Sequence, residues 1–141
     1  MRERTLQKKI AELHSSFVIL SAREELDIVN ISEQEVLELG LISNLPVLIH
    51  KAYEILNLIT FFTTGADETR AWTIERGMAA PQAGGVIHSD FEKTFIRADV
   101  IRWNTLLEAG GYTQAYEKGQ VRMEGKEYIV QDGDVIEIKH G

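Results

Sequence analysis

Three residues with metal-ligating side chains, His88, Asp90 and Glu92, alternate along the chain. On a β-strand this spacing would place all three on one face, where they would bind a metal ion. The run from Asp90 to Lys93 instead favours a helix, in which the three side chains point in different directions. His88 then has two other interpretations: it orders the segment by hydrogen bonds, or it contacts a partner. We expect no metal site.

Catalytic chemistry is not predicted either. Ser89 lies between His88 and Asp90, but a Ser–His–Asp triad is assembled from distant positions, because adjacent side chains point apart. The chain has no G-x-x-x-x-G-K-[ST] or G-x-G-x-x-G motif that would bind phosphates, and Gly84-Gly85 is followed by an apolar pair. The absence of cysteine excludes thiol chemistry and thiolate zinc sites. We therefore predict no catalytic residue and no cofactor in this chain.

Basic and aromatic residues alternate in the segment that follows. Cations beside aromatic rings can hold phosphates and stack on bases, and Lys93, Arg97 and Arg102 lie close to Phe91 and Trp103. Carboxylates in the same stretch cancel much of this charge, so an ordinary surface of ion pairs is the alternative. The predicted contacts to RNA or another partner are His88, Lys93, Arg97 and Arg102.

The elements that must position these residues are short strands and helices. Leu58–Thr64 is rich in β-branched and aromatic residues, and 70–76 is its predicted antiparallel partner. Residues 96–101 alternate and predict a third strand with Ile96 in the core. A polar helical segment is expected around 105–117. The predicted core residues are Phe61, Trp72, Phe95, Ile96 and Val100.

The closing strands complete the predicted sheet. A turn at Asp132-Gly133 separates 128–130 from 135–139 and predicts two further strands. The order strand, strand, helix, strand, irregular segment, strand, strand is typical of an α+β fold in which a mixed sheet packs on one helix, the β-grasp (ubiquitin-like) arrangement.

Helices dominate the prediction before this sheet. Residues 2–13 have helical apolar spacing, whereas the apolar run 17–20 is typical of a buried strand. Ser32 and Glu35 have capping-box spacing, and Gly40 is expected to end that helix. The next helix begins near Pro46, and its apolar stripe is expected to face a core. The members of this stripe are Leu45, Leu48, Ile49, Ala52 and Leu56.

Composition sets limits on the partners. The 141 residues carry a net charge of −7, from 15 Lys and Arg against 22 Asp and Glu, so we expect no DNA partner. No apolar run approaches the roughly 20 residues that cross a bilayer, and the charged N-terminus does not resemble a signal peptide. We expect a cytoplasmic protein with no membrane partner. The predicted domain boundary lies near Asn57.

Five segments resemble the C-terminal part of the YchF family, the Obg-like ATPases, whose last module is a TGS domain. They are FVILSAREELDI (17–28), LIHKAYEILNLITFFTTG (48–65), RAWTIERG (70–77), APQAGGVIHSDFEKTFIRADVI (80–101) and EGKEYIVQDGDVI (124–136). The resemblance implies that residues 58–141 form the TGS domain. It also implies that 1–57 hold the end of the nucleotide-binding (G) domain, including its last strand, and the connecting helices.

The same resemblance implies a function for the longer parent protein. The parent would be an ATPase or GTPase that binds ATP or GTP with Mg²⁺ through motifs that precede this region. Ser21, Ala22 and Arg23 would match the family's Ser-Ala-Lys loop beside the nucleotide base, with Arg in place of Lys. This region would act as a binding module that contacts the ribosome, or an RNA–protein surface, and the parent's own G domain. The alternative is an intramolecular regulator of nucleotide hydrolysis that makes no RNA contact.

Overall fold

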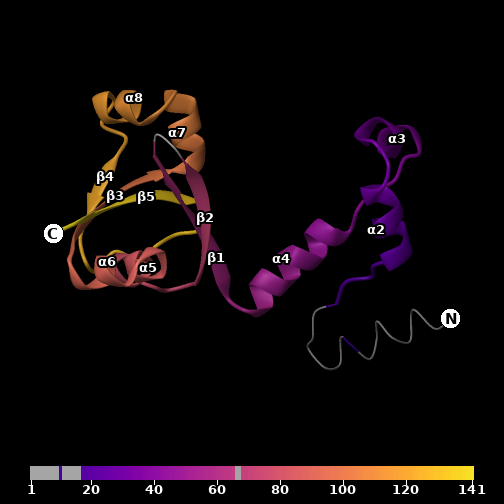
Figure 1. The fold of residues 1–141 in the computed structure, drawn as a ribbon, viewed down its shortest axis with the longest axis horizontal. Helices are drawn as coiled ribbons and strands as arrows, with labels where there is room; N and C mark the ends of the chain where they lie inside the picture. Colours follow the sequence, from indigo (N-terminus) through magenta and orange to yellow (C-terminus); the bar gives the residue numbers. More distant parts are fainter. Residues whose placement is uncertain (1–9, 11–16, 66–67) are drawn as a thin grey trace. The chain divides into compact units, whose positions relative to one another are not determined.

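A computed structural model describes residues 10, 17–65 and 68–141 (Figure 1). The chain divides into two compact units, Met1–Leu56 and Asn57–Gly141. The helix predicted over 2–13 lies outside the described residues except for Ile10. No helix in the described part of the chain is long and apolar enough to span a membrane.

Three helices form the described part of the first unit: α2 (Ala22–Val29), α3 (Glu33–Glu38) and α4 (Leu45–Ile55). The predicted capping box is confirmed, because the Ser32 hydroxyl accepts from the Glu35 N–H at 3.3 Å and the Ser32 N–H donates to the Glu35 carboxylate at 2.9 Å. Gly40 follows α3 with a φ of 62°, the left-handed conformation expected after a helix.

Two predictions for this unit are wrong. Residues 17–20 form no strand, and the side chains of Phe17 and Ile19 are exposed. A single strand needs a neighbour for its backbone hydrogen bonds, and no described segment pairs with this one. Helix α4 forms as predicted, but the apolar side chains of Leu45, Leu48 and Leu56 are also exposed. The stripe on α4 therefore faces no core within the described part of its unit.

The second unit is built on a five-stranded sheet. Its elements are β1 (Leu58–Thr64), β2 (Thr69–Glu75), α5 (Ala80–Ile87), α6 (Ser89–Lys93), β3 (Phe95–Arg102), α7 (Trp103–Ala109), α8 (Tyr112–Glu117), β4 (Arg122–Glu124) and β5 (Asp134–His140). The strand order is β2-β1-β5-β3-β4. β1 and β5 are parallel, with Phe62 opposite Val135, and the other neighbours are antiparallel. The predicted mixed α+β class is confirmed.

Helices cover both faces of this sheet, with α5 and α6 on one side and α7 and α8 on the other (Figure 1). The α5 side contains the larger core, in which Ile59, Phe61 and Val100 are almost inaccessible to solvent. On the opposite side Ile101 and Val135 pack against residues of α7 and α8. Because successive side chains on a strand alternate in direction, β1, β3 and β5 contribute to both cores.

Several details of the sheet differ from the prediction. The register of β3 shifts between Phe95 and Arg97, so Phe95 enters the core and Ile96 is 60% exposed, not buried as predicted. Trp72 is only partly buried beside the core. Residues 128–130 form no strand, because Ile129 makes a single bridge to Ala79. The short strand β4 was not predicted.

Candidate binding groove

The start of α7 brings a tryptophan to the surface beside the turn at Asp132-Gly133, which precedes β5. Trp103 is the first residue of α7, and its N–H donates to the carbonyl of Gly133 at 3.1 Å. Leu107 lies one helical turn later, on the same side of the helix. The side chains of Trp103 and Leu107 are 49% and 71% exposed, respectively. These two residues form an uncovered apolar pair among the described residues of the second unit.

A tight glycine turn ends α7 and starts α8. Gly110 ends α7 with a φ of 92°, and Gly111 follows with a φ of 131°, values that side-chain-bearing residues rarely adopt. The turn lets Tyr112 begin α8 immediately and fold back against the sheet. The glycine pair therefore shapes the end of a surface depression beside the apolar pair.

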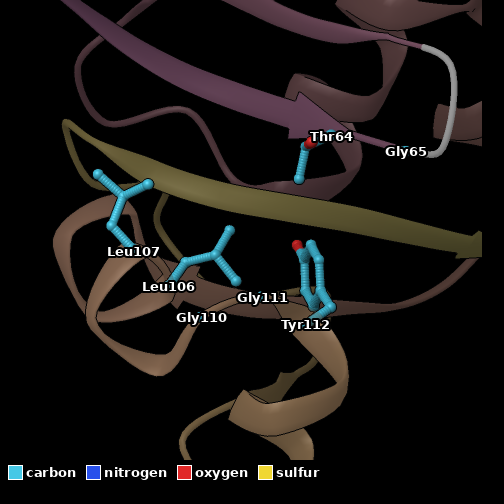
Figure 2. Close-up of a pocket in the computed structure, with 7 residues that line it drawn as sticks. All are labelled: Thr64, Gly65, Leu106, Leu107, Gly110, Gly111 and Tyr112. Atoms are coloured by element: carbon cyan, nitrogen blue, oxygen red, sulfur yellow. The ribbon is translucent and has the colours of Figure 1, made fainter.

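This depression consists of two adjoining hollows of about 680 and 270 Å³. Thr64, Leu106 and Leu107 line both hollows. The larger hollow is also lined by Gly65, Gly110, Gly111 and Tyr112, and the smaller by Phe62, Thr69, Trp103 and Val135. Figure 2 shows Thr64, at the end of β1, facing Leu106 and Tyr112 from α7 and α8. We name these two hollows together the Trp103 groove.

The wall of the groove contains one unusual polar group. The hydroxyl of Tyr112 is buried and has no hydrogen-bond partner among the described residues. Burial is the main reason that the pKa of Tyr112 is raised above its usual value, and the negative charge of Glu137 adds to the shift. Tyr112 therefore stays neutral at physiological pH and contributes mainly its ring to the groove.

A buried carboxylate ties α8 to the sheet beside this groove. Asp99, on β3, is 1% exposed, accepts from the Tyr116 hydroxyl at 2.8 Å and pairs with the Arg97 guanidinium at 3.0 Å. The hydrogen bond and ion pair raise the pKa of Arg97, while partial burial and the bond to Asp99 raise the pKa of Tyr116 to about 12. This network is structural, since every member is engaged by another.

A second buried carboxylate lies on the opposite, α5 side of the sheet. Asp134 is fully buried and accepts from the Tyr128 hydroxyl at 2.7 Å and the Gln131 N–H at 2.8 Å. Its other oxygen lies 3.6 Å from Arg102 and 4.0 Å from Arg122, without a hydrogen bond to either. Two arginines thus offset the charge of one buried acid.

The structure does not gather the predicted cationic contacts into one patch. Arg97 pairs with Asp99 on the α7–α8 side, whereas Arg102 lies near Asp134 on the α5 side and donates to the Asp132 carbonyl at 2.6 Å. Lys93 is exposed at the end of α6 and has no ion-pair partner among the described residues. The charges between 88 and 102 therefore form a mosaic of cations and carboxylates.

His88 and the loop residues lie elsewhere. His88 precedes α6, where its Nδ1 accepts from the Asp90 N–H at 3.3 Å. Within the described ranges no group of three His, Asp or Glu side chains could hold a metal ion. Ser21 caps α2 by accepting from the Glu24 N–H at 3.4 Å, and Ala22 and Arg23 are exposed in the first turn.

The groove residues were not singled out from sequence, apart from Trp103 as an aromatic neighbour of the cations. Two local signals point to part of the site. Trp103 and Leu107 have the four-residue spacing of neighbours on a helix, and Gly110-Gly111 is a typical break between two helices. Nothing local indicates Phe62 or Val135, which reach the groove only through the parallel pairing of β1 with β5.

Fold and site together define a mixed α+β domain with an apolar groove and two structural carboxylate networks. Residues 58–141 match the family model YchF-GTPase_C, described as "Protein of unknown function (DUF933)". The chain therefore belongs to the YchF family, and it matches the model for that family's C-terminal region.

Named relatives agree with this assignment. The chain is 45% identical over 131 residues to the ribosome-binding ATPase YchF of Bacillus subtilis, covering 89% of this chain and 36% of that protein. It is 46% identical over 119 residues to Obg-like ATPase 1 of Caenorhabditis elegans, covering 82% and 30%. The YchF GTPase structure from Schizosaccharomyces pombe superposes with a TM-score of 0.89 at 34% identity, covering 99% of this chain and 38% of that one. The chain thus spans about a third of the length of these relatives, from 30% to 38%.

Proposed function

We propose that this chain is the C-terminal region of a longer nucleotide hydrolase and that it serves as a recognition module. Residues 58–141 would be a TGS domain of the β-grasp type. The strand order β2-β1-β5-β3-β4, with a parallel central pair and α5 between β2 and β3, supports this assignment. Residues 1–57 would be the end of the nucleotide-binding domain and its connecting helices, with Ser21, Ala22 and Arg23 beside the base.

In this proposal the nucleotide chemistry belongs to the rest of the parent protein. ATP or GTP with Mg²⁺ would bind outside this chain, which has no phosphate-binding loop in its sequence. The chain would contribute contacts to a partner and to the parent's own G domain.

The partner we propose is the ribosome. Relatives of this chain are named ribosome-binding ATPases, and they match it over most of its length. The observation that carries a docking role is the Trp103 groove, an exposed apolar depression on this domain. The buried carboxylates Asp99 and Asp134 have structural roles instead. Exposed aromatic and aliphatic side chains beside a depression are typical of protein-binding surfaces.

The cationic residues add a second part to this proposal. Lys93 is free to contact the ribosome, whereas Arg97 and Arg102 can do so only with their exposed atoms, since both also hold acids of their own chain. His88, with its side chain 60% exposed, lies one short helix away from Lys93. We propose these residues as separate contacts around the module.

Sedimentation of the 141-residue chain with purified ribosomes tests the docking role. We expect the chain to pellet with ribosomes. At each of several salt concentrations, Lys93→Glu should weaken pelleting, because it replaces an exposed positive charge by a negative one. Lys126→Glu is the matched control, since it reverses another exposed lysine outside the proposed contacts. A chain that stays in the supernatant at every salt concentration would refute docking. Equal effects of the two variants would refute only the role of Lys93.

An intramolecular role is the second candidate, and the uncovered apolar face of α4 favours it. Leu45, Leu48 and Ile49 on this helix are all at least 40% exposed. Such a face suits burial against the remainder of the parent, through which this region would regulate nucleotide hydrolysis without an RNA contact. The test compares ATP hydrolysis by the parent and by a form ending before Leu58, with and without ribosomes. A ribosome-independent change in rate supports this role, and unchanged rates exclude regulation by residues 58–141.

A further inference from the structure

We propose that the first half of the β2 edge and the Trp103 groove together bind an extended polypeptide segment, which joins the sheet as an additional antiparallel strand. The segment alternates large apolar residues, directed toward the groove, with polar residues on the opposite face. The inference rests on the proposed docking role of the groove, and it specifies the ribosomal partner as a protein in extended conformation.

The backbone at the start of β2 carries hydrogen-bonding groups that no described strand uses. β2 is an outer strand of the sheet and pairs only with β1 among the described strands. The bond from the Gly65 N–H to the Glu68 carbonyl, at 2.9 Å, sets which alternate residues direct their N–H and C=O groups toward β1. Arg70 is the next residue of that set. Thr69 and Ala71 therefore direct their N–H and C=O groups outward.

The proposed pairing is confined to this half of β2. At the other end of the strand the Glu75 carbonyl already accepts from the Met78 N–H at 3.3 Å. Thr69 and Ala71 are exposed and have small side chains, and neither proline nor a β-bulge interrupts the strand here. These two alternate residues supply two N–H donors and two carbonyl acceptors along the edge. An extended polypeptide matches such a row when it adds to a sheet.

The smaller hollow of the groove reaches this part of the edge. Thr69 lines that hollow together with Trp103 and Leu107. Ala71 lies directly opposite Phe62, which lines the same hollow. Residues that face one another across antiparallel strands have their side chains on the same side of the sheet. The residues that an added strand places opposite Thr69 and Ala71 therefore project on the α7 side, toward the apolar pair.

Exposure of this apolar pair favours large apolar residues at those positions. The side chains of Trp103 and Leu107 are 49% and 71% exposed, and burial of both against a partner is favourable. The hydroxyls of Thr64 and Thr69 share a hydrogen bond at 2.6 Å, so each already has a polar partner. The groove therefore offers mainly hydrophobic contact to the added strand.

The other face of the same edge is polar. Trp72 packs beside the core on the α5 side, and Arg70, two residues earlier, projects on that side too. The exposed Arg70 guanidinium lies 4.2 Å from the centroid of the Trp72 ring. The Trp72 indole N–H already donates to the Thr63 hydroxyl at 3.0 Å. Polar or acidic residues of the added strand suit the positions beside Arg70, which gives the segment its alternating pattern.

Model peptides test the recognition directly. The probe is a short fluorescein-labelled peptide in which leucine alternates with threonine and glutamate. One comparison peptide replaces the leucines by serines, and the other contains the residues of the probe in an order without alternation. We expect the 141-residue chain to bind the probe at least about tenfold more tightly than either comparison peptide in anisotropy titrations. Equal affinities for the three peptides, or no binding of the probe, would overturn the inference.

Amide hydrogen exchange reports on the added strand itself. We expect the probe to slow exchange of the outward Ala71 N–H at least about tenfold, whereas the Trp72 N–H, which faces β1, should change little. Unchanged exchange at Ala71 in the presence of bound probe would overturn strand addition.

A pair of variants at the edge gives a second test of the backbone contact. Ala71→Pro removes an outward donor at an edge position, where proline is compatible with a strand, and should lower the affinity for the probe at least about tenfold. Ala71→Ser keeps this donor and should bind like wild type. Urea unfolding checks that both variants fold. Equal affinities of two folded variants would contradict strand addition.

A second pair of variants connects binding to the groove. Leu107→Glu should lower the affinity for the probe at least about tenfold, because it places a charge in the apolar contact. Ile96→Glu, at another exposed apolar residue, should leave the affinity unchanged. If these two variants behave alike, the groove is not part of the site.

Sedimentation with ribosomes separates this inference from the proposed function. If wild type and Ala71→Pro pellet equally well, strand addition fails while ribosome docking stands. If the probe binds through Ala71 and Leu107 but the chain does not pellet, the peptide site stands and ribosome docking fails. Binding of protein-free ribosomal RNA that Leu107→Glu abolishes would overturn the inference in favour of an RNA ligand.

Discussion

Gly133 and Trp103 lie in direct contact where the β5 turn meets the start of α7. A Cβ atom placed on Gly133 would come within 2.7 Å of Cδ1 of the indole ring. Gly133 also has a φ of 80°, which favours glycine, and its carbonyl accepts from the Trp103 N–H. The position of the exposed indole, and with it one wall of the groove, therefore depends on the absence of a side chain at residue 133.

We expect Gly133→Ala to displace Trp103 and to destabilise the second unit by about 1–3 kcal/mol, because the substitution adds backbone strain and a steric clash. Urea unfolding would measure the stability, and tryptophan emission in a Trp72→Phe background would report on Trp103. Gly125→Ala is the control, since nothing lies within 4 Å of a Cβ at that position. Equal stability and emission for the two variants would contradict the expected contact.

Two tyrosines on α8 provide a matched pair. Tyr116→Phe removes a hydrogen bond to buried Asp99 and should cost about 1.5–3 kcal/mol, the usual range for bonds to charged groups. Tyr112→Phe removes a hydroxyl that has no partner within the described structure, so it should be neutral or slightly stabilising. Chemical denaturation measures both. A larger loss for Tyr112→Phe would show that the unpaired hydroxyl has been assigned to the wrong residue.

Alkaline pH should destabilise the fold through Tyr116. Its pKa is raised to about 12, against about 10 for an unfolded tyrosine. This stabilisation is fully present below about pH 10 and is lost as the pH rises through 12, because the unfolded chain releases the proton first. Denaturation curves at several pH values in this window should show a steeper loss for wild type than for Tyr116→Phe. Parallel losses would exclude this proton as the cause.

Removal of the second buried carboxylate should be costly. Asp134→Ala leaves the Tyr128 hydroxyl and the Gln131 N–H without their acceptor, and each lost bond to a charged group is worth about 1.5–3 kcal/mol. We expect a clear fall in the melting temperature. Asp90→Ala, at an exposed acid, should melt within a few degrees of wild type. A small shift for Asp134→Ala would contradict the structural role that we assign to this carboxylate and its charge balance with Arg102 and Arg122.

Elements with strong local patterns were predictable from the sequence. The β1–β2 pairing, helix α4 and the Ser32–Glu35 capping box all occur as expected. Each depends on residues close in sequence, so composition and spacing suffice to find it. Ile96 shows where this approach fails, because a one-residue shift in register exchanges it with Phe95 in the core.

The predicted contacts show the same limit. Arg97 and Arg102 are five residues apart on one strand, and an odd separation places side chains on opposite faces. The alternation therefore explains why the two arginines lie on opposite faces of the sheet. Their ion pairs with Asp99 and Asp134, however, depend on the fold. The Trp103 groove was beyond local analysis, because its walls come from β1, α7 and β5, which pair only in three dimensions.

The central strand of the sheet, β5, is also its last strand in the sequence. β5 lies between β1 and β3, although the ribosome synthesises it after all the other strands. Until β5 emerges, the β1–β2 hairpin and the β3–β4 pair share no neighbour, and each exposes an edge that could join another chain. The five-stranded sheet can therefore close only after β5 has been synthesised, and a chain truncated before Asp134 would leave both pairs with an exposed edge.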